Sequence, residues 1–505
     1  MIGLNAAAKK LISGIDPANL VWVEPPFSAG QFKGMDMGGV WTYIITLQEV
    51  VGKLRREWST ISQAGCPYIQ PTLTMYYWIN SKERANYKGK EYLLIRSVDQ
   101  LKSNCWAAAG AVGMHDLCFF NAYAWYDSEV ENRDYIPSKN LSNPFGKFMR
   151  EEFYPAALLL RDTKEPQATV ALYLPPESAV YSEKSWNLYR ATCMWERNLA
   201  LYNIHFDVIT ADSPHHRKPE SYKTLIIPMM KYVSKELHQR LLAMTPETRI
   251  VVDKDCPRTY PGMLKLDYKH NPGRPYDQST FNPVIPFLKE LEQQGTGRSF
   301  RAVGSKGDVM YFERIHKGVR YLLVINNHWQ EDEISACAID KKPRGFKLQP
   351  KGVAQGAKII VEHAANQQIY HFRTGKKITF RKDGDKAVFE TSLLPGNAEL
   401  FCIYPEPLTH LTMKIKTVPA KGKISFAELS LKDKNGKFAP GRQIIYATVT
   451  DGRGNNTDET GWYVMEEGRV VIPVRIGLDA PSGNWKITVR EHTTGLRAEA
   501  GFLLK

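Results

Sequence analysis

Apolar and polar positions follow two alternating rhythms over residues 1–150. The runs LVWVEPPF (20–27) and GGVWTYIITL (38–47) are typical of buried strands. The apolar residues that follow recur every three or four positions, which predicts an amphipathic helix over 47–61. The strand-like runs CPYIQPTLTMYYWI and DLCFFNAYAWY flank a second predicted helix, LKSNCWAAAGAVG. Strands that alternate with helices predict βα units and a mostly parallel sheet.

Residues 151–298 repeat the α/β rhythm in shorter segments. ATVALYL, FDVIT, TLIIPM and RIVVDK have the character of strands, and WNLYRATCMWERNLALYN and SKELHQRLLAM of helices. This order predicts an open, flavodoxin-like α/β domain. The turn after ATVALYL reads PPESAVYSE and lacks the glycines of a nucleotide phosphate loop, so no cofactor is expected.

From about residue 299 the pattern changes to period two. Short alternating segments such as DVMYFERI, VRYLLVIN and AELFCIY are separated by Gly, Asn and Lys turns, which predicts a β-sandwich over 299–406. A Pro-Glu-Pro break at 405–407 precedes a second all-β section, 407–505, of Ig-like or macroglobulin-like size. The fold class expected is therefore multidomain, α/β plus all-β.

Charge and hydropathy limit the partners. The formal net charge is +14, but acids are interleaved with the basic residues, and no aromatic-basic array of a nucleic-acid-binding protein is present. The excess charge is interpreted as a solvated basic surface, with attraction to acidic polysaccharide as the alternative. No run approaches the roughly 20 apolar residues of a membrane span.

The cysteines do not indicate a disulfide framework or a metal site. There are seven, widely spaced and mostly in apolar surroundings, and no CxxC pair indicates zinc. Free cysteines favour a reducing compartment, whereas two accessory sandwiches favour export to the periplasm or the cell exterior. The sequence therefore leaves localisation open.

The order of sections and the stretch LKSNCWAAAGAVGMHDLCFFNAYAW resemble the C-terminal part of a family 42 glycoside hydrolase, the bacterial β-galactosidase type. The resemblance implies the C-terminal half of a (β/α)8 TIM barrel, strands five to eight, over 1–150. It also implies a trimerisation-like flavodoxin domain, hence a homo-oligomer, over 151–298. Because four barrel strands would be missing, we expect the chain to be the tail of a longer protein or to be completed by another chain.

Candidate catalytic acids follow from the same resemblance. In the family, one acid follows strand four and the nucleophilic Glu ends strand seven, where this chain has Gln70, Pro71 and Thr72. Two loop acids remain, Glu24 and Asp36, which could act as acid and base. The alternatives for Glu24 are binding of a sugar hydroxyl or a solvated loop acid, and for Asp36 ordinary turn chemistry beside glycine.

Aromatic residues gather near the expected strand ends. Their rings can stack on the C–H face of a sugar, with amides nearby for its hydroxyls. The alternative is that the rings are core residues, because strands are rich in buried aromatic residues. The residues expected to bind sugar are Trp22, Trp41, Tyr43, Gln70, Trp78, Asn121 and Trp125. His115 is interpreted as a core residue, His215 and His216 as surface residues, and Asp253 and Asp255 as strand-end acids without a cofactor motif.

Two hypotheses follow for function. The first is a carbohydrate-active enzyme, a β-galactosidase-like glycoside hydrolase acting on an oligo- or polysaccharide. The second is a catalytically inactive glycan-binding or cell-surface scaffolding protein with a degenerate barrel. A weaker third, an extracellular spacer or adhesion module, comes from residues 407–505 alone. The sugar, its linkage and the stereochemical outcome do not follow from the sequence.

Overall fold

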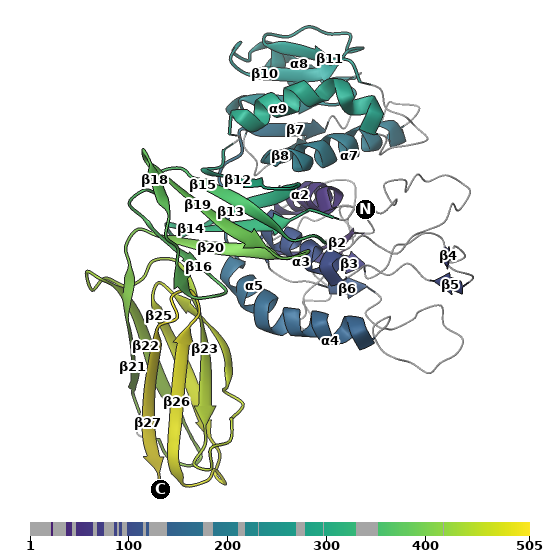
Figure 1. Ribbon diagram of the computed structural model, residues 1–505. Coiled ribbons are helices and arrows are strands. Elements are labelled where there is room, and N and C mark those ends of the chain that lie inside the picture. The colour runs from purple at the N-terminus through teal and green to yellow at the C-terminus, as the bar shows by residue number, and fades with distance from the viewer. Residues whose placement is uncertain are drawn as a thin grey trace. The chain divides into compact units, whose positions relative to one another are not determined.

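The computed structural model (Figure 1) describes the chain in sixteen stretches. They are residues 22–23, 37–42, 47–63, 68–74, 85–87, 90–92, 98–114, 118–120, 139–174, 185–210, 218–230, 232–268, 278–295, 297–329, 352–417 and 419–505. The chain divides into two compact units. The first draws on 1–143, 166–298 and 327–353, and the second on 144–165, 299–326 and 354–505.

A four-stranded parallel sheet opens the first unit. Its strands pair in the order β1-β2-β3-β6, which is also their order along the chain. The strand bounds are Trp22–Val23 (β1), Met37–Thr42 (β2), Tyr68–Thr74 (β3) and Cys118–Phe120 (β6). A short hairpin, Ala85–Tyr87 (β4) and Lys90–Tyr92 (β5), lies between β3 and β6 in the chain. The expected βα alternation is confirmed for these residues.

Two helices accompany this sheet. Helix α2 spans Leu47–Gln63 and buries the apolar stripe that the sequence predicts, including Val50, Leu54 and Ile61. Helix α3 spans Val98–Val112 and is buried along almost its whole length from Leu101 onward. Its alanines and Gly110 leave little side-chain volume, so a helix of this composition can be enclosed on all sides.

A second parallel sheet of the first unit has five strands. Its strands are Val170–Leu174 (β7), Phe206–Thr210 (β8), Thr224–Ile227 (β9), Arg249–Asp253 (β10) and Met263–Leu266 (β11). They pair in the order β8-β7-β9-β10-β11. Its helices are Ser185–Leu201 (α7), Lys235–Leu242 (α8) and Ile285–Gln293 (α9), with 3-10 turns at Pro219–Ser221 (η4) and Gln278–Val284 (η5).

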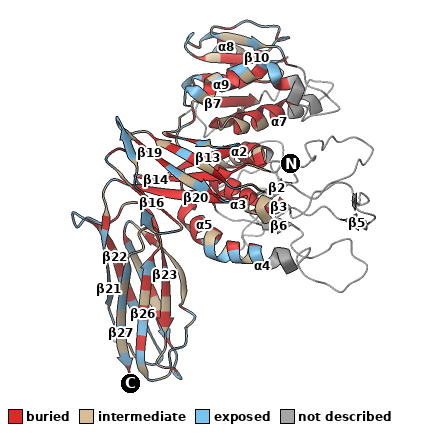
Figure 2. Cartoon of the chain, viewed as in Figure 1, coloured by how far each residue is buried: buried red, intermediate tan, exposed pale blue. Residues whose placement is uncertain are grey.

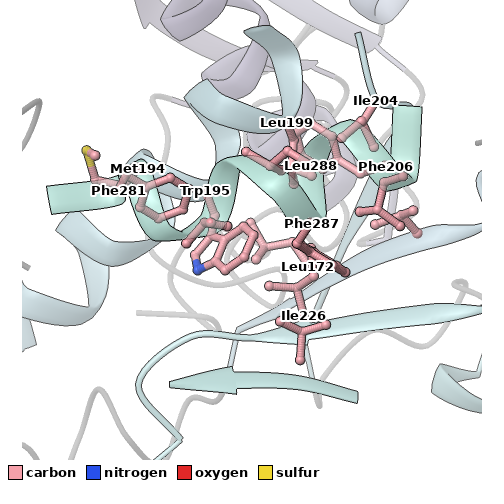
Figure 3. Packing of buried hydrophobic residues seen from close by; sticks show 14 of the residues in the cluster. Leu172, Met194, Trp195, Leu199, Ile204, Phe206, Ile226, Phe281, Phe287 and Leu288 are labelled. Carbon is pink, nitrogen blue, oxygen red and sulfur yellow. The ribbon is translucent and has the colours of Figure 1, made fainter. Parts of the chain in front are cut away.

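Helices cover both faces of this sheet, which explains its continuous apolar strands. Residues of α7 and α9 share one core cluster with Val170 and Leu172, while α8 contributes to a second cluster with Ala171 and Tyr173. At the centre of the first cluster lies Trp195 (Figure 3). The Trp195 indole N–H donates a 2.8 Å hydrogen bond to the Tyr268 hydroxyl, so this large ring is buried without leaving its donor unpaired.

The second unit contains a two-sheet β-sandwich. One sheet has the order β12-β15-β19-β18 and the other β13-β14-β20-β16-β17. Both contribute to one core cluster, which includes Phe300, Phe389 and Phe401. The strands are Phe300–Gly304 (β12), Val309–His316 (β13), Val319–Asn326 (β14), Gln355–Val361 (β15), Gln368–His371 (β16), Lys376–Lys377 (β17), Arg381–Asp383 (β18), Lys386–Leu393 (β19) and Ala398–Tyr404 (β20).

A seven-stranded antiparallel sheet, in the order β21-β22-β25-β24-β23-β26-β27, also belongs to the second unit. A single residue pair joins β24 to β25. Burial alternates along β22 and β26, as expected for strands with one face in a core (Figure 2). The strands are Leu408–Ile415 (β21), Lys423–Asp433 (β22), Arg442–Thr450 (β23), Gly461–Glu466 (β24), Arg469–Ile476 (β25), Gly483–Glu491 (β26) and Arg497–Leu504 (β27).

A helical segment at 139–160 was not expected from the sequence. It runs from α4 (Lys139–Phe148) through a π-helical turn, η3 (Met149–Phe153), into α5 (Tyr154–Leu160). Pro144 and Pro155 interrupt the usual helical signal of this stretch, since proline lacks the N–H that a helix interior needs. Residues 144–165 belong to the same compact unit as the β-sheets of 299–326 and 354–505.

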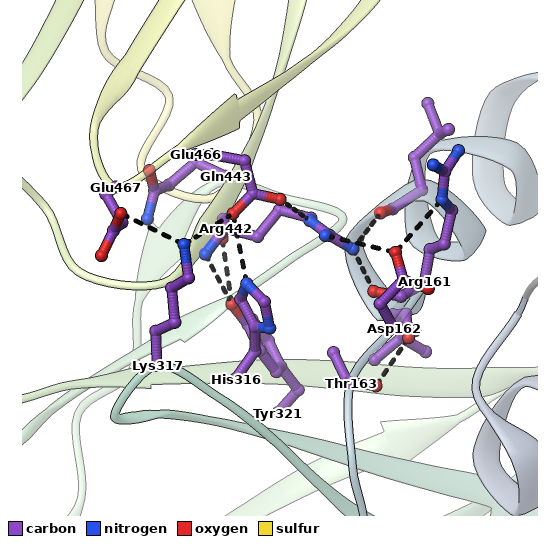
Figure 4. A network of polar contacts seen from close by, with 12 residues as sticks. Arg161, Asp162, Thr163, His316, Lys317, Tyr321, Arg442, Gln443, Glu466 and Glu467 are labelled. Atoms are coloured by element: carbon purple, nitrogen blue, oxygen red, sulfur yellow. Dashed lines mark hydrogen bonds and ion pairs between the residues drawn. The ribbon is translucent and has the colours of Figure 1, made fainter. Parts of the chain in front are cut away.

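Arg442 of β23 ties α5 to the C-terminal strands (Figure 4). Its guanidinium donates to the carbonyl oxygens of Leu158 (3.3 Å) and Arg161, and it pairs with the Glu466 carboxylate. The backbone N–H of Arg442 donates to the Tyr321 hydroxyl at 3.0 Å. One buried arginine therefore caps the last carbonyls of a helix and joins strands from two sheets.

The four cysteines whose state is described, at 105, 193, 256 and 402, are free thiols, and three of them are buried. Burial raises the pKa of the Cys105 and Cys402 thiols well above the usual range, which keeps them protonated and unreactive. Among the described helices, none has the length and apolar character needed to cross a membrane.

Candidate functional site

Three described strands of the four-stranded sheet are each followed by a residue that the sequence predicts to bind sugar or to catalyse its hydrolysis. Strand β1 ends at Val23, one residue before Glu24, and β2 ends at Thr42, one residue before Tyr43. Strand β6 ends at Phe120, one residue before Asn121. The three strands are parallel, so their carboxyl ends point toward the same edge, where such sheets carry their chemistry. Val23 is level with Gly38, four residues before Thr42 along β2.

The register relates Gln70 of β3 to the strands β1 and β2. Val23 pairs with Gly38, and Gly38 pairs with Ile69. One residue further along, Gly39 of β2 pairs with Gln70 of β3. Gln70 itself lies within β3, which continues to Thr74, and its side chain is partly exposed.

The described residues contain only part of the predicted site. Trp22 opens β1, and Trp41 pairs with Thr72 across β2 and β3, which places their backbones in the sheet. Glu24, Asp36, Tyr43, Trp78, Asn121 and Trp125 lie outside the described residues, as do His115, His215 and His216. Their roles stay predictions.

A buried charge cluster holds α2, the helix after β2, against α7. The Arg56 guanidinium pairs with the Glu196 carboxylate at 3.1 Å and with the Glu57 carboxylate at 3.2 Å. Gly52 of α2 packs directly on Glu196, since a Cβ there would lie 2.7 Å from the Glu196 Cβ. The sequence offers no sign of this cluster, because its partners lie 140 positions apart.

Burial shifts the pKa values of two groups in the cluster, Glu196 and Lys53. Loss of hydration raises the pKa of Glu196 to about 7, although the neighbouring Arg56 acts in the opposite direction. Burial also lowers the pKa of Lys53 in the same cluster. The cluster supports the helix behind β2, and its Glu196 carboxyl takes up a proton near neutral pH.

The strand-end acids of the five-stranded sheet have different surroundings. The Asp253 carboxylate accepts a hydrogen bond from the backbone N–H of Met229, a residue with a positive φ of 50° in the turn after β9. It also lies against the buried Tyr268 hydroxyl. Asp253 therefore stabilises a strained turn, whereas Asp255 is exposed.

A hollow of about 450 Å³ opens on the sandwich sheet of β12, β15 and β19. Its lining includes Ser305, Lys358, Glu390, Thr391 and Ser392. Lys358 and Glu390 are cross-strand partners, so their charges balance, and no aromatic ring lines the hollow. It therefore lacks the stacking surface that a sugar site uses.

No protein-family model matches the chain, and no curated protein sequence matches it. Solved structures with partial likeness include glycoside hydrolases and a macroglobulin. An alpha-L-fucosidase isoenzyme 2 from Paenibacillus thiaminolyticus is 10% identical over 70% of this chain, with a TM-score of 0.44, and the chain spans 62% of that enzyme's length.

Two further likenesses are more limited. A Bacteroides uniformis beta-glucuronidase is 9% identical over 40% of this chain and 32% of its own, with a TM-score of 0.14. An E. coli alpha-2-macroglobulin is 13% identical over 37% of this chain and 14% of its own, with a TM-score of 0.17. With TM-scores below 0.5, these likenesses do not establish the chemistry of this chain.

Proposed function

We propose that this chain is a carbohydrate-active protein whose sugar site lies at the carboxyl edge of the four-stranded parallel sheet. One observation carries the proposal: β1, β2 and β6 are parallel strands of one sheet, and Glu24, Tyr43 and Asn121 directly follow the last described residue of each. An acid, a ring with a hydroxyl and an amide are the groups that bind sugar hydroxyls and stack on a sugar face.

The proposed organisation follows the family 42 glycoside hydrolases. The sheet β1-β2-β3-β6 would be the C-terminal half of a (β/α)8 barrel, and 151–298 a flavodoxin-like domain through which copies of the chain associate. Its strand order, numbered from β7, is 2-1-3-4-5, which is the flavodoxin order and supports that part of the proposal. Residues 299–406 and 407–505 would be two accessory sandwiches.

The proposed chemistry is hydrolysis of a glycosidic bond. Glu24 would donate its proton to the glycosidic oxygen as that bond breaks, while Asp36 would accept a proton from the water that attacks the anomeric carbon. Gln70, in the register position beside Gly39, would hydrogen-bond a sugar hydroxyl. Trp22, Trp41, Trp78 and Trp125 would line the site with rings.

A second candidate is a glycan-binding protein without catalysis. The whole of β3 reads YIQPTLT and carries no carboxylate, although the family's nucleophile belongs to the corresponding strand. An amide at Gln70 can bind a hydroxyl but cannot attack an anomeric carbon. This observation favours a site that retains sugar and does not cleave it.

One experiment separates the two candidates. The 505-residue protein and its Glu24→Gln variant would be assayed for hydrolysis of aryl galactosides and galacto-oligosaccharides, and for calorimetric binding of the same sugars. Hydrolysis that falls at least about 100-fold in Glu24→Gln, but not in the exposed-helix control Glu236→Gln, supports the enzyme. Binding without hydrolysis supports the second candidate, and the absence of both overturns the proposal.

A further inference from the structure

Four residues form one continuous cross-strand row on the C-terminal sheet. Trp462 of β24 pairs with Tyr446 of β23, Tyr446 pairs with Arg490 of β26, and Arg490 pairs with Arg497 of β27. Directly paired residues share a face of the sheet, so two rings and two guanidiniums stand side by side.

This row lies on the outer face. Along β26 the residues Trp485, Ile487, Val489 and Glu491 are buried, and the intervening Lys486 and Arg490 are exposed. Tyr446 is 38% exposed between buried neighbours, and Arg497 is exposed at the start of the edge strand. Tyr446, Arg490 and Arg497 therefore face solvent together, and Trp462 beside them is partly buried.

The ring of Trp462, at the aromatic end of the row, is fixed by contacts with neighbouring rings. The Trp462 ring packs edge-on against Tyr446, with centroids 4.8 Å apart, and against His492 at 5.2 Å. His492 in turn packs on the buried Phe372 at 4.5 Å. A ring supported in this way does not have to be ordered when a ligand binds beside it.

The arginine end of the row is electrostatically unfavourable by itself. Like charges placed directly opposite each other on neighbouring strands destabilise a sheet. Within the stretches that the structure describes, no carboxylate forms an ion pair with Arg490 or Arg497, while the nearby Lys486 is paired with Glu499 at 2.8 Å. Two adjacent guanidiniums without an acid are the arrangement that a planar anion bridges with bidentate hydrogen bonds.

We propose that the row Trp462–Tyr446–Arg490–Arg497 is a binding surface for an acidic polysaccharide, one that carries uronate carboxylates. A pyranose ring stacks on the aromatic pair, and the carboxylate of the same or the next sugar is held by the two arginines. The adjacent row of the same face supplies Thr448 and Thr488, whose hydroxyls can bond to sugar hydroxyls.

The geometry favours a polysaccharide over single-stranded nucleic acid. Nucleic acid binds by stacking successive bases on parallel ring faces along a basic groove. Here the two rings are inclined at 69° to each other, so they offer one stacking face and one edge.

This surface is independent of the sugar site proposed above, and its test measures binding of a different sugar. The 505-residue protein would be titrated with polygalacturonate and, as a matched neutral probe, with fully methyl-esterified polygalacturonate. We expect tight binding of the acid form that weakens as salt increases, and at least about tenfold weaker binding of the ester. Equal binding of the two probes would overturn the proposal.

Point variants locate the binding. Arg490→Gln and Arg497→Gln should each weaken polygalacturonate binding by about tenfold or more, and Tyr446→Ala should weaken it as well. Arg301→Gln, an exposed arginine on β12, serves as the control for loss of one charge. Because Arg497→Gln removes a repulsion at an edge strand, its melting temperature should not fall. Unchanged binding in both arginine variants, or tighter binding of a single-stranded oligonucleotide than of polygalacturonate, would contradict the proposal.

Discussion

Arg56 of α2 and Glu196 of α7 form a buried ion pair, with the guanidinium nitrogen and the carboxylate oxygen 3.1 Å apart. The pair joins the helix that follows β2 to the helix that follows β7, so it connects the two α/β layers of the first unit. The Arg56 side chain is 10% exposed and that of Glu196 3%. Burial on this scale makes the stability of the contact depend on protonation.

Glu196 should make the first unit less stable as the pH rises. Its pKa is about 7 in the fold against an ordinary value of 4.5, so the folded state holds the proton more tightly than the unfolded state does. Its stabilising contribution is therefore complete below pH 4.5 and is lost as the pH rises through 7. At 1.36 kcal/mol per pKa unit, the loss amounts to roughly 3 kcal/mol at most.

Hydrogen exchange of α2 and α7 peptides at pH 4.5 and 7.5 measures this effect in the wild type and in Glu196→Gln. Because Gln resembles the protonated acid and does not titrate, the variant should lack the pH-dependent loss of protection. Peptides from β22 serve as an internal control. Identical pH dependence in the two proteins would show that Glu196 does not carry it.

Removal of one partner of the pair should be costly. Arg56→Met leaves the Glu196 and Glu57 carboxylates without their shared cation, and a broken buried pair typically costs about 3–5 kcal/mol. Replacement of both partners, Arg56→Met with Glu196→Leu, should restore most of that loss. Arg240→Met, which removes an exposed pair with Glu236 on α8, should change the free energy of unfolding by under about 0.5 kcal/mol.

Two helical glycines should respond in opposite directions to alanine. Gly52→Ala brings a methyl group within 2.7 Å of the Glu196 Cβ and 3.0 Å of its carbonyl carbon, which should destabilise the first unit by about 1–3 kcal/mol. Gly146→Ala in α4 meets only the flexible Arg150 guanidinium at 3.4 Å. It should stabilise by about 0.5–1 kcal/mol through helix propensity. Thermal unfolding of the two variants measures both, and a stabilising Gly52→Ala would contradict the close helix crossing.

Arg442→Met should loosen α5. The substitution removes the donors to the Leu158 and Arg161 carbonyls and leaves the Glu466 carboxylate without its guanidinium (Figure 4). We expect a loss of about 3 kcal/mol, because several buried polar groups lose their partners together. Exchange of α5 amides should rise. In the control Lys434→Met, which removes the exposed pair with Glu406, they should stay protected.

The sequence predicts elements where a periodic pattern is strong. The stripe of Val50, Leu54 and Ile61 predicts α2, and the alternation along KISFAELSLKD predicts β22. Prediction from the sequence fails where the periodic pattern is short or interrupted. The four residues MLKL show no clear period that would predict β11. Pro144 and Pro155 argue against a helix, so the helical segment at 139–160 was not predicted. The partly buried β11 also lacks the continuous apolar run of its neighbours.

Sites that depend on pairing between distant segments could not be predicted. The sequence predicts that Glu24 and Asn121 each follow a strand, because the apolar runs before them are strand-like. The buried cluster of Arg56 and Glu196 requires the crossing of two helices, and the row that joins Tyr446 to Arg490 requires the register of β23 and β26. The local order of apolar and polar residues determines neither the register between two strands nor the crossing of two helices.

We propose that sugar binds at the carboxyl edge of the sheet β1-β2-β3-β6. Photolabelling with a neutral galacto-oligosaccharide that carries a diazirine, followed by mass mapping of the labelled peptides, tests it most directly. We expect label in the peptides that contain 22–43, 70–78 or 121–125, and loss of that label when free oligosaccharide is added. Label confined to the sandwiches, or unaffected by the competitor, would contradict it.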